Sequence, residues 1–277
     1  MSLNKIFLRK KIEEFLEEDI GYSDITTDNL PISRYVSGEI IAKEEFIVAG
    51  LDFTGEVFKV LDQDVKFEKC KEDGEFVGKG QVIARLEGNG KSLLKAERVS
   101  LNILQKLSGI ATQTRKYVDV LEGLRTRILD TRKTTPGFRA FEKYAVKVGG
   151  GKNHRFSLYD MVMLKDNHIK MVGSITKAVE YVKSRVSPMV KVEVEVSNLE
   201  EFEEALSTEV DIVMLDNMSL DDVRKAIEMN KGKKLLEASG NITLENVRDY
   251  GLTGVDFVSS GAIIHSARWV DISLRFK

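Results

Sequence analysis

The chain has 277 residues, 42% hydrophobic and 31% charged, with only three prolines, which excludes a disordered or low-complexity protein. Its single cysteine, Cys70, excludes an internal disulfide framework and any zinc or iron–sulfur site built from several thiolates. The formal charge of -2, without a long apolar run or a signal-like N-terminus, predicts a cytoplasmic protein that binds neither nucleic acid nor membrane.

The first hundred residues predict a small β-rich domain. Short alternating runs lie between Ser37 and Leu86, and turn residues such as Asp73-Gly74 separate them. One helix is expected to interrupt the strands over residues 53–61. The pattern is typical of a small sandwich with helices at its edges.

A long helix is expected over residues 91–107, where apolar residues recur at helical spacing and Gly109 is expected to end the helix. On this otherwise apolar helix, Arg98, Asn102 and Gln105 form a polar stripe.

After Thr126 the pattern changes to strands that alternate with helices. Six apolar strands are expected, at residues 126–130, 159–164, 190–196, 211–215, 234–237 and 255–259. Ser197 to Glu200 matches a capping box, and Ser219 and Thr243 are expected to cap later helices. Such units predict a parallel α/β barrel or an open doubly wound sheet.

Polar, chemically capable residues follow each of these strands, which favours the barrel. Because the carboxyl ends of barrel strands converge on one mouth, these side chains are expected to meet there. No G-x-G-x-x-G follows a strand, so a Rossmann dinucleotide site has no support.

Residues 130–170 are locally basic, with nine Lys or Arg against four acidic residues. At a barrel mouth these cations predict a site for a small polyanion, since Arg and Lys bind carboxylate and phosphate. The alternative is a solvated basic face. Of the three histidines, His154 is the best candidate to contact a ligand.

Two carboxylates, Glu195 and Asp216, come at the ends of neighbouring strands. They could hold Mg²⁺ against phosphates, stabilise a cationic transition state, or simply neutralise the basic lining. Glu193 points to the same face as Glu195 and competes with it, but Glu195 lies nearer the strand's end. Ser239-Gly240 and Ser260-Gly261 follow the last two strands, where barrels commonly bind phosphate.

Several longer motifs resemble one family, quinolinate phosphoribosyltransferase. They occur in order over nearly the whole chain: Glu18–Thr27, Glu97–Asn102, Ser108–Thr112, Asp130–Gly137, Glu142–Val146, Gly149–Arg155, Lys165–His168, Glu193–Val196, Leu215–Asn217, Glu237–Gly240 and Gly261–Ser266.

The resemblance implies an α/β fold, with an N-terminal α/β sandwich domain and an open, irregular α/β barrel of the type II phosphoribosyltransferase kind. The expected domains are residues 1–108, completed by residues 268–277, and residues 109–267. It implies transfer of phosphoribose from phosphoribosyl pyrophosphate to quinolinate, with loss of CO₂ and pyrophosphate, as a step of de novo NAD biosynthesis. It further implies Mg²⁺ as cofactor and a homo-oligomer, either a dimer or a hexamer of dimers.

The resemblance also assigns site residues. Quinolinate is expected to contact Thr131, Arg132, His154, Arg155 and Lys165, together with Arg98 from the partner subunit. Lys133, Glu195 and Asp216 are the expected catalytic residues; they engage phosphoribosyl pyrophosphate, and the two carboxylates hold its Mg²⁺ directly or indirectly. The 5′-phosphate is expected at Ser239, Gly240, Asn241, Ser260, Gly261 and Ala262. Asn241 stands where a second glycine is usual.

Three other interpretations remain. One is a molybdenum-transport accessory protein of the same fold, against which the basic set of Arg98, Arg132, His154, Arg155 and Lys165 favours quinolinate. Nicotinate phosphoribosyltransferase takes a monoacid, for which so many cations would be surplus. Residues 73–81 resemble the turn of a biotinyl or lipoyl carrier domain, but no lysine sits in a convincing attachment turn.

Overall fold

The computed structural model describes residues 4–277 and divides the chain into two compact units. The first unit contains residues up to Arg115, Pro136–Gly150 and Ala267–Lys277, and the second contains Lys116–Thr135 and Gly151–Ser266. The predicted domain boundaries stay a prediction. No helix within residues 4–277 is both long and apolar enough to cross a membrane.

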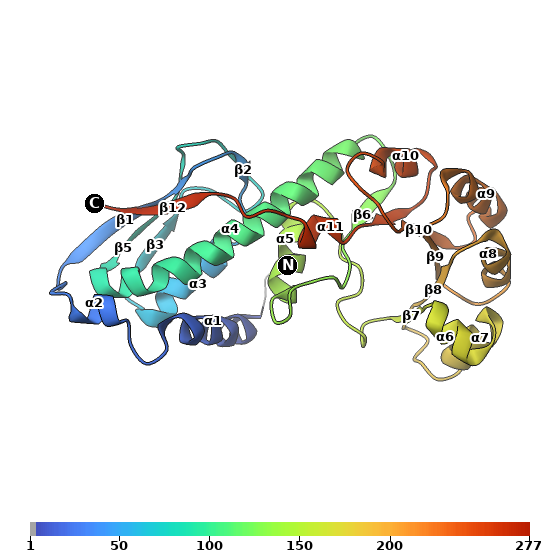
Figure 1. Ribbon diagram of the computed structural model, residues 1–277, viewed down its shortest axis with the longest axis horizontal. Coiled ribbons are helices and arrows are strands. Elements are labelled where there is room, and N and C mark those ends of the chain that lie inside the picture. Colours follow the sequence, from blue (N-terminus) through green and yellow to red (C-terminus); the bar gives the residue numbers. More distant parts are fainter. Residues whose placement is uncertain (1–3) are drawn as a thin grey trace. The chain divides into compact units, whose positions relative to one another are not determined.

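The first unit is built on a four-stranded antiparallel sheet (Figure 1). Its order is β12 (Ile272–Phe276), β1 (Tyr35–Ala42), β5 (Val82–Asn89) and β3 (Lys66–Lys69), so the C-terminal strand pairs with the first strand of the chain. A small second sheet joins β2 (Phe46–Ile47) to β4 (Phe76–Val77). The helices of this unit are α1 (Lys5–Ile20), α2 (Ile25–Asn29), α3 (Leu51–Leu61) and α5 (Arg139–Val148), with most of α4 (Gly90–Val120).

Helix α3 packs on the sheet because the residues on its inner face are small or aromatic. The ring of Phe58 stacks on Phe67 of β3, with 6.1 Å between centroids, and Gly55 lies against the same ring. The other face of α3 meets α1, whose buried residues Leu8, Ile12 and Leu16 recur at i and i+4.

The second unit is a six-stranded parallel sheet, with an order of β6–β11–β10–β9–β8–β7. The strands are β6 (Arg127–Leu129), β7 (Val162–Leu164), β8 (Val192–Val196), β9 (Ile212–Asp216), β10 (Leu235–Ser239) and β11 (Phe257–Ser259). The helices are α6 (Asp166–Val172), α7 (Ile175–Lys183), α8 (Leu199–Leu206), α9 (Leu220–Asn230), α10 (Val247–Leu252) and α11 (Ala262–His265).

The sheet order leaves β6 and β7 at opposite edges, so the predicted α/β barrel is open. Each connection from β7 to β11 carries a helix, and Figure 1 shows α7 to α10 along the outer side of the strands. All six expected strands are present. The α/β fold class, with an antiparallel N-terminal sheet and an open parallel sheet, is therefore confirmed.

Three details of the helices were predicted wrongly. Helix α4 does not end at Gly109 but continues to Val120. Gly109 serves packing instead: a Cβ on it would lie 2.1 Å from the carbonyl oxygen of Arg268. The capping box at Ser197 is shifted by one residue, because Asn198 accepts the capping hydrogen bond from the Glu201 N–H. Thr243 does not cap α10, which begins after Asn246. The cap at Ser219 was predicted correctly.

Candidate active site

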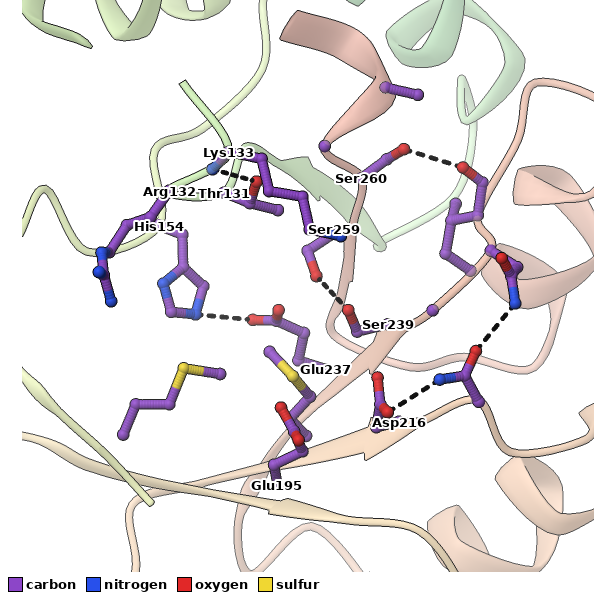
Figure 2. Close-up of a pocket in the computed structure, with 18 of the residues that line it drawn as sticks. Thr131, Arg132, Lys133, His154, Glu195, Asp216, Glu237, Ser239, Ser259 and Ser260 are labelled. Carbon is purple, nitrogen blue, oxygen red and sulfur yellow. Dashed lines mark hydrogen bonds and ion pairs between the residues drawn. The ribbon is translucent and has the colours of Figure 1, made fainter. Parts of the chain in front are cut away.

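A cavity of about 780 Å³ lies at the carboxyl ends of the parallel strands, within the second unit (Figure 2). Every expected site residue of this unit lines it: Thr131, Arg132, Lys133, His154, Arg155, Lys165, Glu195, Asp216, Ser239, Gly240, Asn241, Ser260, Gly261 and Ala262. The fold thus brings together side chains that are up to 131 residues apart in sequence (131 to 262). Their individual roles stay predictions.

Arg98 is the expected site residue that does not line this cavity. It lies on α4 in the first unit, with its side chain exposed. Of the polar stripe on that helix, Gln105 has a structural role, since its Nε2 donates to the carbonyl of Ile272 at 3.1 Å.

Asp130 positions the segment that carries His154 and Arg155. Its side chain is fully buried, accepting hydrogen bonds from Asn153 Nδ2 at 2.6 Å and from the His154 backbone N–H at 2.8 Å. The backbone N–H of Asp130 also donates to the carbonyl of Lys152, and this bond extends the parallel pairing next to β6. This anchoring role was not predicted from the sequence.

The two arginines form the cationic wall of the cavity. Arg155 is 8% exposed, and its Nη1 donates to the carbonyl of Met161 at 3.2 Å. Burial, and then the charge of Arg132, lower the pKa of Arg155. The Nε of Arg132 is buried and has no hydrogen-bond partner within residues 4–277. Two close guanidinium groups with an unsatisfied donor form a site that an anion would stabilise.

A buried cluster adjoins these arginines, and two of its members, His154 and Glu237, also line the cavity. His154 Nε2 is 2.9 Å from Glu193 Oε2 and 3.4 Å from Glu237 Oε2, and the two carboxylates are 0% and 1% exposed. Figure 2 shows the imidazole directed at Glu237. Burial lowers the pKa of His154, but Glu193 and Glu237 raise it by more. Burial and the charge of Glu237 raise the pKa of Glu193.

The backbone N–H of Arg155 donates to His154 Nδ1 at 2.8 Å, so Nδ1 must keep its lone pair. The ring therefore carries its proton on Nε2, facing the carboxylates. The pKa values of His154 and Glu193 are both raised because these groups share one buried, closely spaced cluster with Glu237. His154, Glu193 and Glu237 have ligand atoms within 4.8 Å of one another, but a protonated Nε2 cannot bind a metal ion.

The more accessible carboxylates are Glu195 and Asp216. Glu195 forms an ion pair with Lys165, and the two side chains are 14% and 44% exposed. Asp216 accepts a hydrogen bond from Asn217 Nδ2 at 2.8 Å. Asp216 ends β9, Glu195 is the last residue but one of β8, and both offer the oxygen ligands that Mg²⁺ prefers. They therefore fit the expected metal position better than the buried cluster does.

Small residues form the wall of the cavity opposite Arg132 and Arg155. Ser259 Oγ donates to Ser239 Oγ at 3.0 Å, and Ser260 Oγ donates to the carbonyl of Ile242 at 2.8 Å. A Cβ on Gly261 would lie 2.9 Å from Lys133 Cδ, so a side chain at this position would displace that of Lys133. These loops leave backbone N–H groups and hydroxyls near Lys133, which is a suitable lining for phosphate.

Sequence reasoning expected Glu237 at the carboxyl end of its strand but assigned it no role, and it set Glu193 aside in favour of Glu195. It placed Glu193 and Glu195 on one face of β8 and chose the one nearer the strand's end. The only available signal was charge within an otherwise apolar strand, since a buried carboxylate requires a partner.

Comparison with known proteins gives a consistent result. The model of the quinolinate phosphoribosyl transferase N-terminal domain matches residues 24–108, and that of its C-terminal domain matches residues 110–275. A probable nicotinate-nucleotide pyrophosphorylase (carboxylating) of Synechocystis sp. is 45% identical over 95% of this chain and 90% of its own. A protein of Bacillus subtilis with the same name is 44% identical over 98% and 94%.

Solved structures agree. The crystal structure of NadC from Streptococcus pyogenes is 41% identical and superimposes with a TM-score of 0.95, covering 100% of this chain and 99% of that one. The nicotinate-nucleotide pyrophosphorylase from Francisella tularensis also gives 0.95 and 41%, covering 100% and 98%. With both domain models matched in order and relatives aligned over nearly their whole length, this chain belongs to the quinolinate phosphoribosyl transferase family.

Proposed function

We propose that this chain transfers phosphoribose from phosphoribosyl pyrophosphate to quinolinate, with release of CO₂ and pyrophosphate, giving nicotinate mononucleotide for NAD biosynthesis. The observation that carries this proposal is one cavity that joins a wall of cations to two accessible carboxylates and two Ser-Gly loops. The names of the relatives do not favour the molybdenum-transport alternative.

Quinolinate carries two carboxylates, and the cationic wall matches that charge. The unsatisfied Nε of Arg132 and the buried guanidinium of Arg155 would gain hydrogen-bond acceptors from the substrate. Lys165 reaches the same cavity but is paired with Glu195. A substrate carboxylate that takes Lys165 would release Glu195 towards the ribose.

The chemistry then requires little from acid or base groups. The quinolinate nitrogen forms a bond to C1′ as the bond from C1′ to the pyrophosphate oxygen breaks. Positive charge develops at C1′, and a freed Glu195 or Asp216 stabilises it. The bond from C2 to its carboxylate then breaks, CO₂ leaves, and the electron pair stays at C2 beside the cationic nitrogen until it takes up a proton from solvent to form the C2–H bond.

For the cofactor, we propose that Glu195 and Asp216 hold Mg²⁺ directly or through water. When bound, the ion neutralises charge on the departing pyrophosphate. Lys133, beside Gly261, is proposed to contribute to the same neutralisation. The serine loops are proposed to bind the 5′-phosphate.

We further propose a cytoplasmic homo-oligomer, a dimer or a hexamer of dimers, in which the exposed Arg98 reaches the partner's cavity. Arg98 is a cation at an exposed position of a largely buried helix, which supports this assignment.

The test is a comparison of two acceptors. The purified protein is incubated with Mg²⁺, phosphoribosyl pyrophosphate and either quinolinate or nicotinate, and the mononucleotide is quantified. Turnover restricted to quinolinate is expected, since nicotinate lacks the second carboxylate. Turnover of nicotinate alone would contradict the proposal.

A further inference from the structure

The loops after β9 and β10 interlock beside Asp216. Asn217 and Asn241 both have left-handed backbones, with φ of 54° and 51°. Between them lies Gly240, where a Cβ would be 2.3 Å from Asn217 Oδ1. The backbone N–H of Asn217 donates to the carbonyl of Ser239 at 2.9 Å, continuing the pairing of the two strands beyond Asp216. Two side chains are therefore held in close contact by backbone that few residues adopt.

These side chains form a directed chain of hydrogen bonds. Asn246 Nδ2 donates to the carbonyl of Asn241 at 3.0 Å. Asn241 Nδ2 donates to Asn217 Oδ1 at 3.0 Å, and Asn217 Nδ2 donates to Asp216 Oδ2 at 2.8 Å. The last two bonds are the dashed lines beside Asp216 in Figure 2. We call this series the relay. It runs from Asn246, the residue before α10, through Asn241 and Asn217 to the Asp216 carboxylate in the cavity.

The direction of each bond gives Asn241 a specific task. Its Nδ2 can only donate, so it fixes Oδ1 of Asn217 towards itself and leaves Nδ2 of Asn217 facing Asp216. If the Asn217 amide were turned over, its oxygen would face a carboxylate and repel it. A second glycine at position 241 would keep the backbone but remove this control.

We propose that Asn241 and Asn217 are positioning residues, which hold the Asp216 carboxylate in the orientation that phosphoribosyl pyrophosphate requires. The inference rests on the proposed function, because it takes Asp216 as a contact of that substrate. It assigns to Asn241 a role through its side chain, in addition to the phosphate contact expected from its backbone.

The test is a double-mutant cycle of Asn241→Gly, Asn217→Gly and both together. Glycine keeps the left-handed backbone at each position, so only the side chains are lost. Loss of an outer hydrogen-bond partner typically costs about 10- to 100-fold in activity or metal affinity. We expect each single variant to raise KM for phosphoribosyl pyrophosphate by about 10-fold, at the low end of that range, with KM for quinolinate unchanged.

Because the relay acts as one unit, the double variant should be no worse than Asn217→Gly alone. Lys231→Gly is the matched control: Lys231 also has a left-handed backbone, with φ of 47°, but it lies outside the cavity. Thermal unfolding is measured for all of these variants, including the control. A defect that follows lowered stability, or multiplicative effects in the double variant, would overturn the proposal.

Failure of the proposed function would look different. In that case the unaltered protein would form no nicotinate mononucleotide, whatever the state of the relay. The relay is then judged by calorimetric binding of phosphoribosyl pyrophosphate with Mg²⁺. Weaker binding by Asn241→Gly than by Lys231→Gly would support it, and equal binding would refute it.

Discussion

Replacement of Gly109 by alanine sets helix propensity against packing. Gly109 lies inside α4, where alanine is favoured over glycine by about 1 kcal/mol. However, the new Cβ would lie 2.1 Å from the Arg268 carbonyl oxygen, 3.1 Å from its carbon and 3.4 Å from Trp269 Cα. All three are backbone atoms, so no side chain can rotate away. Relief requires movement of the segment that leads into β12.

Overpacking of this kind costs about 1–3 kcal/mol, and so close a contact with backbone belongs at the upper end. Subtracting the propensity gain leaves a net destabilisation of about 2 kcal/mol. Urea unfolding followed by circular dichroism measures it. Lys116→Gly, at an exposed position of the same helix, is the control and should lose about 1 kcal/mol. A Gly109→Ala protein as stable as the unaltered chain, or more stable, would refute the reasoning.

Three further predictions concern the site, the first unit and the oligomer. Arg132→Ala should raise KM for quinolinate by at least about 10-fold, the equivalent of one charge-assisted hydrogen bond, with normal thermal unfolding; unchanged quinolinate affinity would contradict the assignment. Burial and the charge of Asp73 raise the pKa of Tyr144, whose hydroxyl donates to Asp73 at 2.6 Å. The protonated Tyr144 stabilises the fold fully below the unfolded pKa of about 10, and this contribution is lost as the pH rises above that value. Tyr144→Phe should therefore lose less stability than the unaltered chain between neutral and alkaline pH. An unchanged dependence of unfolding free energy on pH would contradict this prediction. Mixing inactive Arg98→Ala with inactive Lys165→Ala should restore partial activity through hybrid oligomers, whereas no recovery despite proven subunit exchange would argue against a shared site.

The parallel sheet was largely predictable because its strands are nearly continuous apolar runs. The sequence pattern located all six, and the polar residues after them line one cavity. Their convergence follows from a general property of parallel sheets and needs no knowledge of particular contacts.

The errors at Gly109 and Glu193 share a physical cause, which is contact between residues distant in sequence. The two errors in helix capping are local shifts, to Asn198 and to Asn246. Gly109 resembles a helix end locally, but Arg268, 159 positions later, explains it. Locally, Glu193 resembles a competitor of Glu195. Its buried partners come from distant segments, because Glu237 lies on β10 and His154 lies on the segment after β6. The relay through Asn217 and Asn241 likewise joins two loops that no local pattern connects.

The central claim is that this cavity performs both ribosyl transfer and decarboxylation. The most direct measurement supplies the purified protein with Mg²⁺, phosphoribosyl pyrophosphate and quinolinate labelled in its 2-carboxylate, then follows labelled CO₂ and nicotinate mononucleotide over time. The account predicts that both appear in equal amounts and at the same rate. A mononucleotide that retains the label, or the absence of both products from a protein that still binds phosphoribosyl pyrophosphate, would contradict it.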